Sequence, residues 1–121
     1  MARVAALIPD LLFGSKVQAA LEAAGHEVDL VTAEVEAWDE VAGIDVLVVD
    51  LTTDQVDGVA LYETLATGGE LRGVRTLGFF AHVQPEVRER ALAAGFDQVV
   101  PRSRMAREGA ELVTRLTAHE G

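Results

Sequence analysis

The 121-residue chain contains no cysteine and few aromatic residues: one tryptophan, one tyrosine and four phenylalanines. Without cysteine there is no disulfide framework, thiolate nucleophile or cysteine-ligated zinc, so the fold depends on its apolar core. Long apolar runs are also missing, and the N-terminal stretch MARVAALIPD is too short for a signal sequence or a membrane span. We therefore expect a cytoplasmic protein that does not enter a membrane.

Basic residues are scarce as well. Ten Lys and Arg face 20 Asp and Glu, which gives a formal charge of −10 at pH 7. A field of this sign repels a phosphate backbone, so we expect no direct binding of nucleic acid. The length suits one domain covering residues 1–121, and the half-hydrophobic composition is that of a globular protein.

Short apolar runs alternate with segments of helical periodicity along the whole chain. Strands are expected at residues 3–8, 26–32, 44–51, 75–80 and 97–100, and helices at 14–25, 33–43, 57–67, 84–95 and from about Ser103 onward. Repeated strand–helix units predict a parallel sheet with helices on both faces. The predicted fold is α/β and flavodoxin-like: a doubly wound, five-stranded parallel sheet in the order 2-1-3-4-5.

Three of these segments carry a more specific prediction. The run Val46 to Val49 is apolar at every position, which is typical of a strand covered on both faces. Residues 26–32 alternate apolar and polar side chains, which indicates a strand at the sheet edge. The helix at 33–43 is expected to place Val35, Trp38 and Val41 on one face.

Asp50 ends the buried strand, at the sheet edge where α/β proteins bind ligands. The order and spacing of DVLVVDL (45–51), AAGFDQVVPRS (93–103) and LEAAGHEVDLVT (21–32) resemble the receiver domain of two-component response regulators, the CheY-like superfamily. The resemblance covers almost the whole chain. It places Asp50 at the phospho-acceptor position of that family.

The same resemblance implies a depleted phosphorylation site. A receiver holds magnesium with an acidic pair and the acceptor, and binds the phosphoryl oxygens with a hydroxyl residue and a lysine. Here the acidic pair aligns with Pro9 and Asp10, or with Ile8 and Pro9 without a gap, and the hydroxyl position falls on Phe80. The lysine position holds Arg102, followed by Ser103 in place of proline. Magnesium binding then rests on Asp10 and Asp50, and no cofactor is expected.

Each of the two carboxylates has a simpler alternative. Asp10 could be the N-cap of the first helix, which is the interpretation we favour. Asp50 could hydrogen-bond a turn amide or cap the helix near Asp57. His82 could join both carboxylates in a transition-metal site on neighbouring strand ends, although a hydrogen-bonded structural histidine is the preferred interpretation.

Arg102, Arg104 and Arg107 gather around a helix start in an otherwise acidic chain. With Ser103 and Ser15, Arg102 could hold an anion. The simpler interpretation is that these arginines offset nearby carboxylates.

From the sequence we expect a degenerate receiver-like domain in two-component signalling that binds a protein partner and is not an enzyme. A homodimer is expected through Arg88, Glu89, Phe96, Arg104 and Glu108. Two alternatives stay open. One is a receiver phosphorylated on Asp50, and the other is a flavodoxin-like binder of a small anionic ligand.

Overall fold

The computed structural model describes residues 2–81 and 85–118. Strands and helices alternate along the chain as β1 (Arg3–Leu7), α1 (Leu11–Ala23), β2 (Glu27–Val31), α2 (Glu34–Glu40), β3 (Val46–Asp50), α3 (Gly58–Thr67), β4 (Arg75–Phe80), α4 (Pro85–Ala94), β5 (Gln98–Pro101) and α5 (Arg102–Ala118). α1 begins at Leu11, three residues before the predicted start, because Asp10 caps it there.

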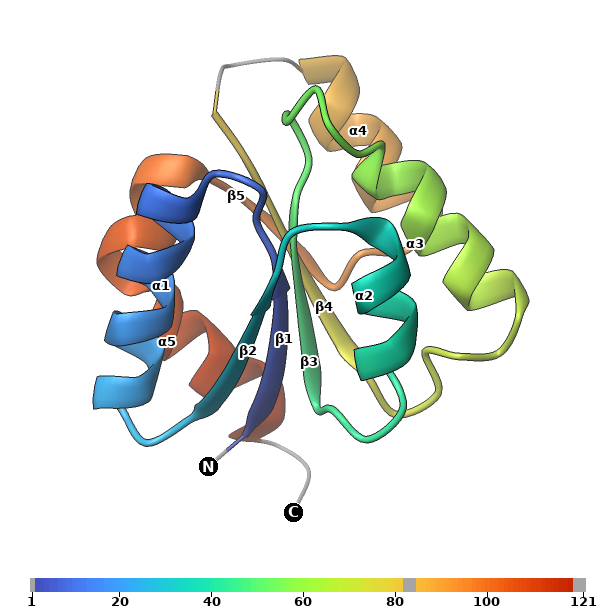
Figure 1. Ribbon diagram of the computed structural model, residues 1–121. Coiled ribbons are helices and arrows are strands. Elements are labelled where there is room, and N and C mark those ends of the chain that lie inside the picture. The colour runs from blue at the N-terminus through green and yellow to red at the C-terminus, as the bar shows by residue number, and fades with distance from the viewer. Residues whose placement is uncertain (1, 82–84, 119–121) are drawn as a thin grey trace.

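The strands form a five-stranded sheet in the order β2-β1-β3-β4-β5, and every neighbouring pair is parallel. This confirms the flavodoxin-like fold predicted from the sequence. β2 lies at an edge, as its alternating pattern indicated. In a parallel sheet all strand ends of one kind meet, so the residues that follow the five strands share one edge, at the top of Figure 1.

Helices cover the two faces of the sheet unequally. α1 and α5 lie on one face, and α2, α3 and α4 lie on the other (Figure 1). β3 is buried at every position: Val46 and Val48 pack with the α1–α5 side, and Leu47 and Val49 pack with the opposite side. The apolar run therefore belongs to a central strand with a core on each face, as predicted.

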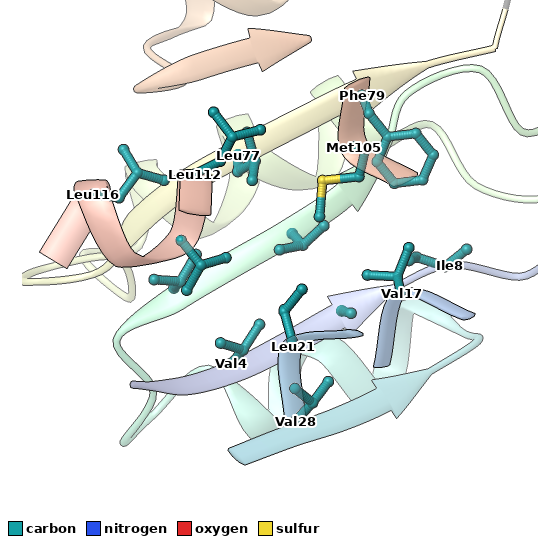
Figure 2. Close-up of a cluster of buried hydrophobic side chains, with 14 of the residues drawn as sticks. Val4, Ile8, Val17, Leu21, Val28, Leu77, Phe79, Met105, Leu112 and Leu116 are labelled. Atoms are coloured by element: carbon teal, nitrogen blue, oxygen red, sulfur yellow. The ribbon is translucent and has the colours of Figure 1, made fainter. Parts of the chain in front are cut away.

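Figure 2 shows the core on the α1–α5 side, where Leu21 from α1 and Met105 and Leu112 from α5 lie over strand residues such as Val4 and Leu77. All five side chains are at most 1% exposed. The apolar residues Met105, Leu112, Val113 and Leu116 of α5 are all buried on this side of the sheet. Burial of this kind removes roughly 2 kcal/mol of unfavourable hydration per large side chain.

The predicted apolar face of the helix at 33–43 is wrong for Val35 and Trp38 and correct for Val41. Val35 is 66% exposed and Trp38 is 36% exposed, whereas Ala37 and Val41 are buried. Positions 37 and 41 are four residues apart and share one side of a helix, and Val35 and Trp38 share another. The small Ala37 side chain lets this short helix approach the sheet closely, which turns the two larger apolar residues outward.

No helix in the described part of the chain is both long enough and apolar enough to span a bilayer.

Candidate functional site

The strand ends bring four of the residues singled out in the sequence to one edge. Asp10 follows β1, Asp50 ends β3, Phe80 ends β4 and Arg102 follows β5. Strand pairing sets their order along the edge, because Asp50 pairs with Phe79 of β4 and Phe80 pairs with Pro101 of β5. Residues far apart in the sequence therefore face a common space.

Asp10 is the N-cap of α1, as the favoured interpretation predicted. Its Oδ1 accepts hydrogen bonds from the backbone N–H groups of Leu12 at 3.1 Å and Phe13 at 3.2 Å. Its Oδ2 accepts a hydrogen bond from Nη2 of Arg102 at 3.0 Å. The Phe13 amide, and after it Arg102, lower the pKa of Asp10. Both carboxylate oxygens are thus engaged by donors of the protein itself.

Arg102 is held on two sides. Its guanidinium carbon lies 4.0 Å from the centre of the Phe13 ring, in addition to its ion pair with Asp10. A planar guanidinium is suited to this combination, because it can stack on an aromatic face while it donates in its plane. Phe13 is a buried core residue. Its second role as the platform for Arg102 was missed.

The other arginines of this helix start are also paired with acids. Arg104 Nε lies 3.4 Å from Glu108, and Arg107 Nη2 lies 3.8 Å from the same carboxylate. This arrangement agrees with the simpler interpretation, in which the arginines offset nearby negative charge. Ser103 is exposed at the start of α5, and Ser15 is exposed on α1.

Asp50 is buried, with 7% of its surface exposed. Its Oδ1 accepts a hydrogen bond from the Thr52 N–H at 3.0 Å, so the turn-amide alternative holds for this residue. The helix-cap alternative is wrong, because Asp57 caps α3 through the Ala60 N–H at 3.0 Å. Burial raises the pKa of Asp50, while the Thr52 amide and the charge of Arg102 act in the opposite direction.

Thr52 joins two loops of the edge and was not singled out in the sequence. Its Oγ1 accepts a hydrogen bond from the Ala81 N–H at 2.8 Å, which ties the segment after β3 to the segment after β4. A threonine two residues after a strand is a common turn residue. That pattern gives no indication of a partner 29 positions away.

An open groove of about 480 Å³ lies beside the Asp10–Arg102 pair. Its lining is mostly apolar and consists of Phe13, Phe80, Ala81, Pro101, Arg102, Ser103 and Ala106. Phe80, at the position that the resemblance assigns to the hydroxyl residue, lines this groove, and 8% of the residue is exposed. The wall of the groove at this position therefore offers carbon and not oxygen.

The metal alternatives involve Asp10, Asp50 and His82. His82 lies outside the described residues. Among residues 2–81 and 85–118, no three His, Asp or Glu side chains are grouped so as to hold a metal ion.

The predicted dimer surface contains one error. Phe96 is 4% exposed, and its ring stacks on Tyr62 with the ring centres 4.4 Å apart. It is therefore part of the core under α3 and α4 and cannot contact a second copy. Arg88 and Glu89 on α4 are exposed, and Arg104 and Glu108 on α5 are partly exposed.

No protein-family model matches this sequence, and no curated protein matches it. Solved structures do match over the full length. The Francisella response regulator 1452 receiver domain superposes with a TM-score of 0.87 at 18% identity, covering 100% of both chains.

Two further structures give the same result. The chemotaxis response regulator CheY4 of Vibrio cholerae matches with a TM-score of 0.82 at 19% identity, covering 96% of this chain and 98% of that one. The signal receiver domain of a signal transduction histidine kinase from Syntrophus aciditrophicus matches with a TM-score of 0.84 at 20% identity, covering 99% and 92%. The chain therefore has the fold of response regulator receiver domains.

Proposed function

We propose that this chain is a degenerate receiver-like module of two-component signalling that acts by binding another protein, without phosphorylation of Asp50 and without catalysis of its own. The receiver fold supports the signalling context. The side chains at the carboxyl ends of the strands support the absence of phosphorylation at Asp50.

The observation that carries this proposal is the ion pair between Arg102 and Asp10 at 3.0 Å. Transfer of a phosphoryl group to a carboxylate requires a divalent cation and fixed donors around the oxygens, because two anions approach each other. At this edge a guanidinium already neutralises Asp10, and the other Asp10 oxygen caps α1. A metal ion would have to displace Arg102 before it could use this carboxylate.

The two carboxylates of this edge have three of their four oxygens engaged by donors of the protein, which disfavours magnesium. Mg²⁺ prefers oxygen ligands in octahedral geometry and is usually held by one or two carboxylates. The residue before Asp10 is Pro9, which has no side-chain oxygen, and one oxygen of the buried Asp50 is bonded to the Thr52 amide. Phe80 offers no hydroxyl to a phosphoryl oxygen. These features together favour structural roles for the carboxylates of Asp10 and Asp50.

Binding of the phosphoryl mimic beryllofluoride tests the proposal. In ¹⁹F NMR with Mg²⁺, beryllium and fluoride, we expect no protein-bound resonance for the wild type. The matched variant replaces Pro9→Asp, Phe80→Thr and Arg102→Lys, which restores the receiver pattern, and it should bind more than the wild type. A wild-type resonance that disappears in Asp50→Asn would overturn the proposal in favour of a competent receiver.

The homodimer stays a prediction, and its predicted surface no longer includes Phe96, the only apolar residue assigned to it. The remaining residues of that surface are charged, and such a surface favours weak, salt-dependent association. Light scattering at rising protein concentration measures this association, and Arg88→Glu is the variant that should weaken it.

A further inference from the structure

The charges of this chain are segregated along its sequence. No Lys or Arg occurs between Lys16 and Arg72, although this stretch holds most of the 20 Asp and Glu residues. It folds into most of α1 and into β2, α2, β3 and α3. α2 and α3 lie on the same side of the sheet (Figure 1), so the acidic α2 and Glu63 of α3 are on that side.

A groove of about 560 Å³ runs between these two helices. Trp38 of α2 lines one side, and α3 and its C-cap line the other with Ala60, Glu63, Thr64, Thr67 and Gly68. The hydroxyl of Thr64 donates to the Ala60 carbonyl at 3.0 Å, so its one donor is already used within α3. The groove thus has an apolar character with a single carboxylate in its lining.

Two large apolar side chains of α2 are exposed, and one of them, Trp38, lines this groove. Trp38 is 36% exposed, and Val35, three residues earlier on the same helix face, is 66% exposed. Tryptophan is the residue most enriched among those that dominate binding energy at protein interfaces. An exposed Trp–Val pair beside an apolar groove is therefore a candidate docking surface.

Glu63 lines the groove, and α2, which supplies Trp38 to it, carries the four carboxylates of Glu34, Glu36, Asp39 and Glu40. Among the described residues, the ion pairs within 4.0 Å do not include Glu34, Asp39 or Glu63. On the same helix, the pKa of Glu40 is raised chiefly by its contact with and repulsion from Asp29. The charge of Arg3 acts on Glu40 in the opposite direction, so in the described part of the chain the carboxylates of α2 and α3 left without an ion pair or a capping role are those of Glu34, Asp39 and Glu63.

We propose that the α2–α3 groove binds a cationic amphipathic segment of another protein. An apolar side chain of that segment would pack against Trp38, and its Lys or Arg residues would meet Asp39 and Glu63. Charge complementarity selects this occupant over a second copy of the chain. A second copy carries the same −10 charge and would bring a net negative surface to the groove. This inference goes beyond the proposed function and does not depend on the state of Asp50.

Trp38 is the only tryptophan, so its fluorescence reports directly on the groove. The probe is a short amphipathic helical peptide of leucine and lysine, and the control peptide has glutamate in place of lysine. We expect the lysine peptide to shift the emission to shorter wavelength and to saturate, because the indole loses water. The glutamate peptide should leave the emission unchanged. Absence of saturable binding of the lysine peptide would overturn the proposal.

Calorimetry with two matched charge variants locates the binding. Asp39→Asn with Glu63→Gln should weaken binding of the lysine peptide about three- to tenfold, since exposed pairs each contribute modestly. Glu22→Gln with Glu111→Gln removes the same charge from α1 and α5 on the other face and should leave the affinity within about twofold. Equal weakening by both pairs would mean non-specific attraction and would overturn the proposal.

Trp38→Ala removes the apolar anchor and should weaken binding about tenfold or more, with an unchanged circular dichroism spectrum. Glu36 is left intact in all variants because its carboxylate caps α2. Sedimentation of the protein without peptide tests whether a second copy of the chain occupies the groove. Self-association that Trp38→Ala abolishes would overturn the choice of a foreign partner.

Discussion

The start of α3 lies so close to β3 that a single methyl group at Gly58 should destabilise the fold. A Cβ atom built on Gly58 would lie 2.6 Å from Cγ1 of Val49, 3.1 Å from the carbonyl oxygen of Asp50 and 3.3 Å from Cδ2 of Leu51. Overpacking of this kind costs about 1–3 kcal/mol, while alanine in a helix gains at most about 1 kcal/mol over glycine. The expected net loss for Gly58→Ala is about 1–2 kcal/mol.

The unfolding entropy converts this loss into a melting temperature. At roughly 2.1 cal/mol/K per residue, a chain of this length loses about 4 °C for each kcal/mol, so Gly58→Ala should melt about 4–8 °C lower. Gly68→Ala at the other end of α3 is the control, because its φ is −78° and the nearest atom to an added Cβ is 3.5 Å away. That variant should stay within about 2 °C in a circular dichroism melt. A Gly58→Ala protein as stable as the wild type would refute the close packing of α3 on the Asp50 strand.

Three other substitutions have definite expected outcomes. Burial raises the pKa of Asp50 above 3.8. Ionisation of this buried group therefore lowers the stability of the fold as pH rises through the folded pKa. Asp50→Asn should therefore melt higher than the wild type at pH 7, with the difference shrinking as pH falls, and an unchanged difference would contradict this. Asp57→Ala removes the α3 N-cap and should lower the melting temperature by about 4 °C; no change would mean the cap contributes nothing. Phe96→Glu places a charge against Tyr62 in the core and should abolish cooperative melting. A variant that stays folded and monomeric would instead support the assignment of Phe96 to the protein surface.

The sequence predicted the fold because strand and helix patterns are local. The four apolar residues from Val46 to Val49 require cover on both faces, and the alternation in residues 26–32 requires one exposed face. Right-handed crossovers then leave few ways to arrange five strand–helix units. The strand order follows from these constraints together.

The side-chain partners at the site could not be predicted in the same way. Arg102 and Asp10 are 92 positions apart, and Thr52 and Ala81 are 29 apart. Local patterns place each residue at the end of a strand, but they do not indicate which donor meets which acceptor. Asp10 is the exception, since an N-cap is recognised from the residues that follow it.

Two errors about burial have a common origin. α2 has only seven residues, so its apolar positions do not define one inward stripe, and Ala37 was overlooked beside Val35 and Trp38. Phe96 was assigned to the surface, whereas it follows α4 and stacks on Tyr62 of α3. In both cases packing against another element decides which side chain is buried.

The most direct measurement of the central claim is the intact mass of the protein after incubation with acetyl phosphate and Mg²⁺. We predict no added phosphate, because Arg102 neutralises Asp10 and neither Pro9 nor Phe80 supplies an oxygen at the site. The pattern-restoring variant, Pro9→Asp with Phe80→Thr and Arg102→Lys, is the matched comparison and should take up more phosphate than the wild type. A wild-type gain of one phosphate that is lost in Asp50→Asn would contradict the account.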